Sequence, residues 1–252
     1  MPHRGEDALR FADAHVHLSD YEDSTQEIGY ARANGAILFS AGIDEPSSRI
    51  SVSLASKHPG IVRAFVGIHP SEATKSEDES WVQKLLARAS GLGEVGMDPG
   101  YSPAAEGGRQ RTLFGAQLSA AEKQKKPVQV HSRGAEKEVL DVLSSHRLDR
   151  VLLHWFQGEG EASLAVEKGY FVSFGPALIL SKKLQRIART WARDRILVET
   201  DGPVPFSALG GAGGSWLIPS VVYRLSELLE LEFSECARVV FDNSLDFLGS
   251  KA

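Results

Sequence analysis

The sequence predicts a (β/α)8 barrel of the TIM type, an α/β fold in which eight parallel strands alternate with helices. Eight short apolar runs alternate with longer amphipathic segments along the 252 residues, as this barrel requires. Histidine, aspartate and glutamate recur late in those runs, and the carboxyl ends of barrel strands converge on one site. In a doubly wound open sheet, which is the alternative, these residues would be spread along an edge.

Each strand candidate is a short apolar run bounded by polar residues or glycine. In chain order the candidates are 11–18 (FADAHVHL), 35–43 (GAILFSAGI), 62–70 (VRAFVGIHP), 91–97 (GLGEVGM), 127–132 (PVQVHS), 150–156 (RVLLHWF), 169–175 (GYFVSFG) and 195–201 (RILVETD).

The segments between the strand candidates carry helical patterns. Residues 207–216 form the one flexible-looking stretch, because they are rich in glycine. No low-complexity linker interrupts the alternation, so we expect residues 1–252 to form a single domain. Examples of the expected helices are 78–90, 109–126, 134–146 and 181–192, and segments 215–232 and 233–249 would complete the barrel.

Composition limits the class of protein. The net charge of −5 argues against a broad nucleic-acid-binding face, which is usually strongly basic, although a small cleft could still grip a strand end. Cys236 is the only cysteine, which fits a reducing compartment, and we expect it to be buried. No run approaches the ~18 apolar residues of a membrane span, and the first ten residues lack an apolar signal core. We therefore expect a soluble, cytoplasmic protein.

The first strand candidate has polar residues at alternate positions, Asp13, His15 and His17. Strand alternation places residues i, i+2 and i+4 on one face. We therefore expect these three side chains to face the barrel interior, and Ala12, Ala14 and Val16 to pack against helices. Two buried imidazoles on one face need polar partners, and a metal ion is a good one. Two exposed or otherwise satisfied histidines are the alternative.

The later strand candidates supply more side chains of the metal-binding type. Four imidazoles and two carboxylates suffice for two divalent ions, with one carboxylate bridging them. The six residues are His15, His17, Glu94, His131, His154 and Asp201.

Eight motifs run in order through almost the whole chain, and they are specific as a set. They are DAHVHL (13–18), GIHP (67–70), GEVGMD (93–98), QRTLFGAQLSAA (110–121), PVQVHSR (127–133), HWFQG (154–158), ETDGP (199–203) and NSLDFL (243–248). With them the sequence resembles the TatD-type metal-dependent hydrolases, a family of the amidohydrolase-like barrel superfamily. The resemblance implies that His15, His17 and Asp201 hold one metal, that Glu94 bridges, and that His131 and His154 hold the second.

The ligand set predicts the chemistry. Two divalent ions (Zn, Mg or Mn) would lower the pKa of a bound water, and the resulting hydroxide would attack phosphorus. Asp201 is the candidate for orienting this water and taking its proton, and Glu94 would act as the bridge. Arg133 and His69 are expected to bind the substrate's non-bridging oxygens. Their alternatives are a surface arginine that opens a helix and a histidine bonded to the backbone.

Three further carboxylates are expected to support the site. Asp13 and Glu199 lie one layer deeper by strand parity, so we expect them to orient ligand imidazoles or to bond core polar groups. Asp98 could act in the same way, but a turn-forming aspartate before Pro99 is slightly favoured.

The leading functional prediction is a divalent-metal-dependent hydrolase that cleaves phosphoester bonds, as a deoxyribonuclease acting on strand ends. The alternative is a two-metal amidohydrolase acting on an amide, a lactone or another C–N or C–O bond, since fold and metals do not fix the substrate. Many such barrels bridge their metals with a modified lysine, and here Glu94 occupies the matching strand. A non-catalytic scaffold is disfavoured by the intact ligand set. We expect no membrane partner, and a monomer is compatible with the sequence.

Two segments depart from the family pattern, and both are expected where substrate would approach. GMDPGY (96–101) replaces the more usual Asp-aromatic-Tyr continuation after the glutamate motif, and VPFSALGGAGGSW (204–216) is glycine-rich. Substrate preference is therefore the property that the resemblance transfers least.

Overall fold

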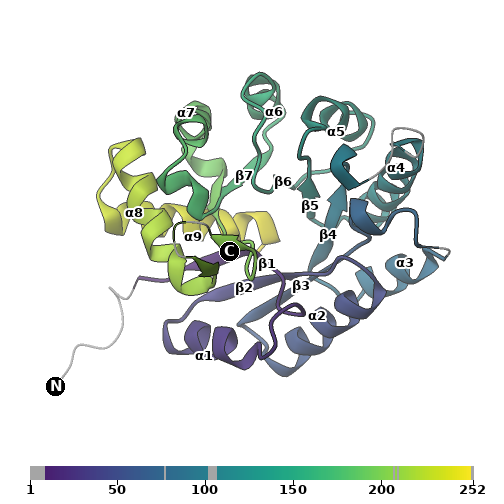
Figure 1. Cartoon of the computed structure of the whole chain (residues 1–252), viewed down its shortest axis with the longest axis horizontal. Helices are drawn as coiled ribbons and strands as arrows, with labels where there is room; N and C mark the ends of the chain where they lie inside the picture. The colour runs from purple at the N-terminus through teal and green to yellow at the C-terminus, as the bar shows by residue number, and fades with distance from the viewer. Residues whose placement is uncertain (1–8, 77, 102–106, 207, 209, 251–252) are drawn as a thin grey trace.

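Eight parallel strands pair in chain order, β1 to β8, in the computed structural model of the chain (Figure 1). The structure describes residues 9–76, 78–101, 107–206, 208 and 210–250. Helices alternate with the strands and surround them, which confirms the predicted (β/α)8 barrel. The strands are β1 (Ala12–Val16), β2 (Ile37–Ala41), β3 (Val62–Val66), β4 (Gly91–Gly96), β5 (Val128–His131), β6 (Val151–Leu153), β7 (Phe171–Phe174) and β8 (Ile196–Val198).

All eight predicted strands are present, but each is shorter than the apolar run that predicted it. Four predicted site residues lie in loops that follow β1, β3, β6 and β8 rather than in the strands: His17, His69, His154 and Asp201. His69 precedes a short 3-10 helix, η1 (Pro70–Glu72), and accepts a hydrogen bond from the backbone N–H of Ser71. The loops therefore deliver several of the candidate side chains to the carboxyl end of the barrel.

The helices also follow the prediction, except that one predicted helical segment is divided in two. The predicted segment 215–232 is split into a 3-10 turn, η7 (Ser215–Leu217), and α8. Residues 207 and 209 of the predicted flexible stretch lie outside the described residues, and a short hairpin, β9 (Pro205–Phe206) and β10 (Gly211–Ala212), flanks them. The helices are α1 (Thr25–Ala33), α2 (Glu45–Lys57), α3 (Ser80–Leu86), α4 (Gly107–Gln124), α5 (Glu136–Leu143), α6 (Ala162–Glu167), α7 (Lys182–Thr190), α8 (Ile218–Leu229) and α9 (Phe233–Leu248).

Aromatic side chains fill part of the barrel interior. Phe39 of β2, Phe65 of β3 and Phe171 of β7 surround Phe247 of α9, with ring centroids 5.6–6.3 Å from it. Strands β2 and β7 lie far apart around the barrel, so their side chains meet inside it. In Figure 1, α9 lies behind the strands. It therefore closes the end of the barrel opposite the candidate site.

The first strand does not keep the alternation that the sequence predicts. Its register with β2 shifts between Asp13 and Val16. Ala12 and Ala14 belong to the interior aromatic cluster, which includes Phe247 of α9, so they face the barrel interior, where the polar side chains were expected, and the helix in their cluster is α9 at the end of the barrel. The prediction that Asp13 shares a face with His15 is wrong, because the irregularity turns the two side chains to different sides. Val16 packs against α1 as predicted.

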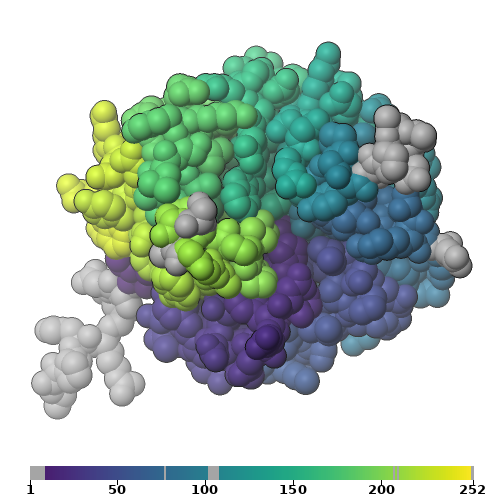
Figure 2. All heavy atoms as spheres, in the orientation of Figure 1, coloured from purple at the N-terminus to yellow at the C-terminus, as the bar shows by residue number. Residues whose placement is uncertain are grey.

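The barrel closes where β1 meets the end of β8. The backbone N–H of His17 donates to the carbonyl of Gly202 (2.8 Å), and that of Asp201 donates to the carbonyl of His15 (2.9 Å). In Figure 2 the yellow-green segment that follows β8 lies against the purple start of the chain. The two ends of the sequence are thereby joined at the candidate site.

Asp13 ties this seam together. Its carboxylate accepts hydrogen bonds from the backbone N–H (2.9 Å) and hydroxyl (2.5 Å) of Thr200 and from the hydroxyl of Ser215 (2.8 Å). Of the two supporting roles expected for Asp13, it therefore takes the second, bonding core polar groups. Burial raises the pKa of Asp13 to about 7 against the opposing effect of these hydrogen bonds.

Two further predictions concern burial and membranes. Cys236 is fully buried in α9, as predicted. Within the described residues, no helix is both long and apolar enough to cross a membrane.

Candidate metal centre

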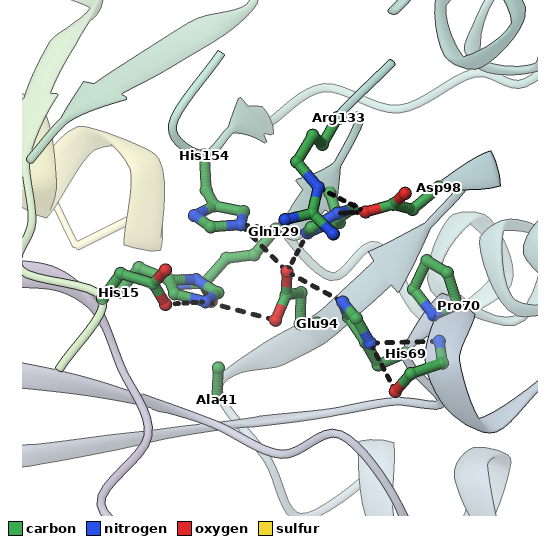
Figure 3. Close-up of polar contacts among 12 residues, drawn as sticks. His15, Ala41, His69, Pro70, Glu94, Asp98, Gln129, Arg133 and His154 are labelled. Carbon is green, nitrogen blue, oxygen red and sulfur yellow. Dashed lines mark hydrogen bonds and ion pairs between the residues drawn. The ribbon is translucent and has the colours of Figure 1, made fainter. Parts of the chain in front are cut away.

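A cavity of about 350 Å³ opens at the carboxyl ends of the strands. Glu94, from β4, lies at its base, and histidines from β1, from β5 and from the loop after β6 surround this carboxylate (Figure 3). The cavity brings together five of the six predicted metal ligands, all but His15, which lies beneath them, and also both predicted substrate-binding residues. Its lining includes His17, His69, Glu94, His131, Arg133, His154 and Asp201.

Close strand packing places the Glu94 segment against β5. A Cβ atom built on Gly96, whose φ is +150°, would lie 1.9 Å from the carbonyl oxygen of His131. Any larger residue at this position would push β4 away from β5, so glycine is needed there. Gly96, the second glycine of the GEVGMD motif, thus allows the close distance between the strands that carry Glu94 and His131.

The two oxygens of Glu94 face two separate groups of side chains. Oε2 lies 3.5 Å from Nε2 of His15 and 3.4 Å from Nε2 of His17. Oε1 lies 2.6 Å from Nδ1 of His131 and 2.9 Å from Nε2 of His154. Glu94 therefore stands between two clusters, as a bridging carboxylate has to.

The first cluster has the spacing of a metal site. The Nε2 atoms of His15 and His17 lie 3.3 Å apart, and Oδ1 of Asp201 lies 3.8 Å and 3.2 Å from them. Four ligand atoms arranged tetrahedrally about 2.1 Å from a zinc ion lie about 3.4 Å from one another. The donor set and its spacing fit a divalent ion.

The second cluster consists of His131, His154 and Oε1 of Glu94. The two facing ring nitrogens lie 3.4 Å apart. This cluster offers fewer donors than the first, so an ion held here would keep positions open for water or substrate. The ring of His154 also stacks on that of His15, with centroids 3.9 Å apart, which packs the two clusters together.

The outer ring nitrogens of the first two histidines are held by fixed acceptors. Nδ1 of His15 lies 3.0 Å from Oε1 of Gln129, whose amide donates to the carbonyl of Ala14. Nδ1 of His17 lies 3.2 Å from the carbonyl oxygen of Ala41. An acceptor at Nδ1 requires a proton there, so each ring presents the lone pair of Nε2 to the centre.

His131 is also oriented by a hydrogen-bond acceptor, but here the acceptor lies at Nε2 instead of Nδ1. Its Nε2 lies 2.8 Å from Oδ2 of Asp98, so Nδ1 faces Glu94. The same Asp98 oxygen accepts from Nε of Arg133, and Oδ1 accepts from the backbone N–H of Gly100. Asp98 thus forms the expected turn and also orients His131. The sequence analysis slightly favoured the turn, but Asp98 takes both of the roles that it considered.

Glu199 is the partner of His154, as one of its expected roles implies. Its Oε1 accepts from the backbone N–H of Trp155 and lies 3.5 Å from Nδ1 of His154, while Oε2 accepts from the hydroxyl of Ser173. Within the described residues, Nδ1 of His154 is a buried nitrogen without a hydrogen bond. The carboxylate that faces this nitrogen is that of Glu199, which is fully buried.

His69 presents a donor rather than a lone pair to the cavity. Its Nδ1 accepts from the backbone N–H of Ser71 (3.1 Å), so the proton of the neutral ring is on Nε2. Nε2 lies 3.5 Å from Oε1 of Glu94. Burial lowers the pKa of His69 to about 4, so the ring is neutral near pH 7. This arrangement suits a hydrogen bond to an anionic group, and the ring also lies within ligand distance of Glu94 and His131.

The charges of the centre are strongly coupled. Burial opposes ionisation of Glu94, but the imidazoles around it, His69 and His154 first, hold its pKa well below the usual value. Burial would also lower the pKa of His17, yet its contacts with Asp201 and Glu94 raise it well above the usual value. When these imidazoles are neutral, the two ionised carboxylates leave negative charge at the centre, which divalent cations would offset.

Sequence reasoning missed two residues of this site. Gln129 precedes His131 by two in β5 and so shares its strand face, and a polar residue in an otherwise apolar strand was the available signal. Tyr101 lines the cavity, and its ring lies 5.1 Å from the Arg133 guanidinium and 5.3 Å from the His69 ring. It lies in GMDPGY, the segment that departs from the family pattern, so the resemblance did not predict a role for it.

The family model described as TatD related DNase matches residues 12–249. The chain belongs to the TatD family of metal-dependent hydrolases. One TatD relative, an uncharacterised metal-dependent hydrolase, YabD, from Bacillus subtilis, is 26% identical over 92% of this chain and 96% of its own length. Another, the deoxyribonuclease TATDN3 of Homo sapiens, is also 26% identical over 92% of each chain.

A solved structure shows the same fold. The TatD homologue YJJV of Escherichia coli K12 superposes with a TM-score of 0.86 at 24% identity, over 94% of this chain and 97% of its own. The barrel described above is therefore the fold of the TatD family.

Proposed function

We propose that this chain hydrolyses phosphoester bonds with divalent metal ions held by the six residues around Glu94. His15, His17, Asp201 and Oε2 of Glu94 would hold one ion. His131, His154 and Oε1 of Glu94 would hold a second. The observation that carries the proposal is the position of Glu94, which directs one oxygen into each cluster. Bound there, divalent cations supply Lewis acidity, which makes water a better nucleophile and offsets charge on a phosphoryl group.

Asp201 is the proposed proton acceptor. Burial opposes its ionisation, but the contact with His17 and the nearby imidazoles lower its pKa below the usual value, so it is ionised at neutral pH. It lines the cavity and adopts φ +54°, in the left-handed region that non-glycine residues rarely occupy. Such backbone conformations concentrate at functional sites. We propose that this conformation holds the carboxylate where it can accept a proton from the attacking water.

His69 and Arg133 are the proposed substrate-binding residues. The Nε2–H of His69 would donate to a non-bridging phosphoryl oxygen. Arg133 is fixed at Nε by Asp98, and its side chain is 58% exposed, so its guanidinium is accessible to an anion. These two donors flank the Glu94 centre on the side of His131.

DNA is the proposed physiological substrate class. The human relative is named a deoxyribonuclease, and the matching family model is described as DNase-related. The nitrogen-rich first cluster favours zinc or another transition ion, whereas carboxylates and phosphates also suit magnesium or manganese.

The test is an assay of the purified chain with Mg²⁺, Mn²⁺ or Zn²⁺ on three substrate classes: a phosphodiester, single-stranded and 3′-recessed DNA, and a panel of amides and lactones. We expect metal-dependent hydrolysis of the phosphoesters, and a loss of at least about a hundredfold in kcat for Asp201→Asn. Asp242→Asn, an exposed acid on α9, is the control and should retain activity. Hydrolysis confined to amides or lactones would replace this proposal with the amidohydrolase alternative.

A further inference from the structure

We infer that a strip of cationic side chains at the amino ends of the strands binds the phosphate backbone of a nucleic acid, away from the metal centre. The strip follows the ends of α2, α3 and α4 and the connection from α5 to β6, which come one after another around the barrel (Figure 1). The proposed reaction does not require it, so it adds a separate contact with nucleic acid. Its six members are Lys57, Arg88, Lys125, Lys126, Arg147 and Arg150.

Two neighbouring hollows in the surface make the strip continuous. The first, of about 330 Å³, lies between α2 and α3, and its lining includes Lys57 and Arg88 but, among the described residues, no acid. The second lies between the end of α4 and the connection to β6, and the other four members of the strip line it. The ammonium of Lys126 donates to the carbonyl of Ala89 (2.6 Å) and thereby brings the two hollows together at Arg88.

Four of the six cations are exposed and have no partner among the described residues. They form no ion pair, no side-chain hydrogen bond and no contact with an aromatic ring there. By contrast, Arg49, which also lines the first hollow, is paired with Glu45 on the same helix. The four unpaired cations are therefore available to an anion. They are Lys57, Arg88, Lys125 and Arg147.

Like charges are crowded in the second hollow. Lys126 is partly buried, and this burial, followed by the nearby guanidinium of Arg150, lowers the pKa of its ammonium. The acids that line this hollow are Glu122 and Asp149, and the carboxylate of Glu122 lies 3.2 Å from Nδ1 of His146. Four cations thus face two acids, and a phosphate group among them would reduce the repulsion.

A phosphate backbone fits the strip better than a membrane surface does. Protein segments that lie on membranes combine basic residues with apolar side chains that enter the bilayer. Among the described residues, none of the exposed large apolar side chains lines either hollow. Lysine and arginine alone suffice to bind a nucleic-acid backbone, because binding is driven by the release of its counterions.

The strip supplies positive charge that the cavity of the metal centre lacks. Among the described residues that line the cavity, Arg133 is the only lysine or arginine, and Asp20, Glu94 and Asp201 are acidic. Attraction of a long polyanion therefore has to come from another part of the surface. A strand bound along the strip would hold the protein on nucleic acid and leave the cavity at the other end of the barrel open.

The test measures, by fluorescence anisotropy, the binding of a long, labelled, phosphorothioate-linked oligothymidylate to the Mg²⁺-loaded protein. These linkages resist hydrolysis, so binding is read without turnover. We expect the wild type to bind, and replacement of the four unpaired cations by alanine to raise the Kd at least about tenfold at low salt. The slope of log Kd against log salt concentration should fall by up to about 3, because each phosphate neutralised on a single strand contributes about 0.7.

A matched control variant separates the strip from the general charge of the protein. It removes two lysines and two arginines from exposed positions outside the strip and should change the Kd by less than about twofold. Each single substitution within the strip should lower the salt slope by about 0.7, so the inference stays testable if the combined variant does not fold. The control positions are Lys168, Lys182, Arg189 and Arg238.

Three results would overturn the inference. The first is no binding of the strand by the wild type, and the second is an equal loss in the strip variant and the control. The third is strip-dependent binding to phosphatidylserine vesicles without binding to DNA, which would assign the strip to a membrane surface. No step of the assay depends on hydrolysis, so a failure here would leave the proposed function standing.

Discussion

Three of the four imidazoles of the centre each owe their orientation to one particular partner. Gln129 holds His15, the carbonyl of Ala41 holds His17, and Asp98 holds His131. These partners decide which ring nitrogen carries the proton and therefore which one is free to bind a metal. The chemistry of the site thus depends on residues that never touch the ion.

Gln129→Leu tests this dependence. The substitution leaves Nδ1 of His15 without its acceptor in a fully buried place, so the ring loses its fixed tautomer. We expect metal affinity to fall by about 10–100-fold, as measured by competition with a chromophoric chelator. Gln185→Leu is the matched control, because Gln185 is also a buried glutamine. Its amide donates to the carbonyls of Leu178 and Ile179 in η4 (Pro176–Ile179), away from the metal centre. Equal metal affinity in the two variants would contradict the assigned role.

His69 gives a prediction about pH. Burial lowers its pKa to about 4 in the folded chain, against 6.5 for an unperturbed ring. The unfolded chain therefore binds more protons between these values, and stability falls as pH decreases from 6.5 to 4. We expect the wild type to lose up to about 3 kcal/mol more than His69→Gln over this range, by urea unfolding of both proteins in chelator. Parallel pH profiles would show that His69 is not held neutral.

At the scale of elements, the seam between β1 and β8 determines where the first metal cluster forms. His15 and His17 come from one side of the seam and Asp201 from the other, and their backbones bond directly across it. Asp13 adds side-chain hydrogen bonds to Thr200 and to Ser215 of η7. Three segments that are remote in sequence are thereby fixed around one carboxylate.

Asp13→Ala should destabilise the fold more than it disturbs the chemistry. It leaves the buried donors of Thr200 and Ser215 without an acceptor, and each such loss costs about 1–3 kcal/mol. We expect the free energy of unfolding to fall by about 2–4 kcal/mol, as measured by urea denaturation followed by tryptophan fluorescence. Asp13→Asn retains one acceptor oxygen and should lose less. Asp23→Ala, an exposed aspartate that caps Thr25, is the control. A loss in Asp13→Ala no larger than the control would contradict the role of the seam.

At the scale of the whole molecule, the sequence predicted most of the architecture. Alternating apolar runs identified all eight strands, and the residue types late in those runs identified the side chains that meet in the cavity. Both signals are periodic or chemical, so they are visible in a single chain.

What the sequence could not predict depends on local geometry. Alternation failed in β1, because a register shift separates Asp13 from His15. Asp98 was undervalued because one carboxylate forms a turn with one oxygen and orients His131 with the other. Tyr101 was missed because its place beside Arg133 depends on a 3-10 turn, η2 (Pro99–Tyr101), rather than on a periodic pattern.

A metal centre that joins opposite ends of the chain should stabilise the whole barrel. An ion that binds only the folded state adds RT ln(1 + [L]/Kd) to the free energy of unfolding, about 2.7 kcal/mol at a hundred times Kd. We therefore expect a chelator to lower the Tm of the wild type by several degrees, by scanning calorimetry, and added metal to restore it. The His17→Ala variant, which lacks a ligand of the first cluster, should respond much less. An unchanged Tm in chelator would separate the fold from metal binding.

Anomalous scattering from crystals of the metal-loaded protein tests the central claim most directly. The account predicts two peaks, one on each side of the Glu94 carboxylate: the first among His15, His17 and Asp201, the second between His131 and His154. The absorption edge would identify the element. Crystals that bind metal only elsewhere on the surface, with no peak beside either oxygen of Glu94, would contradict it.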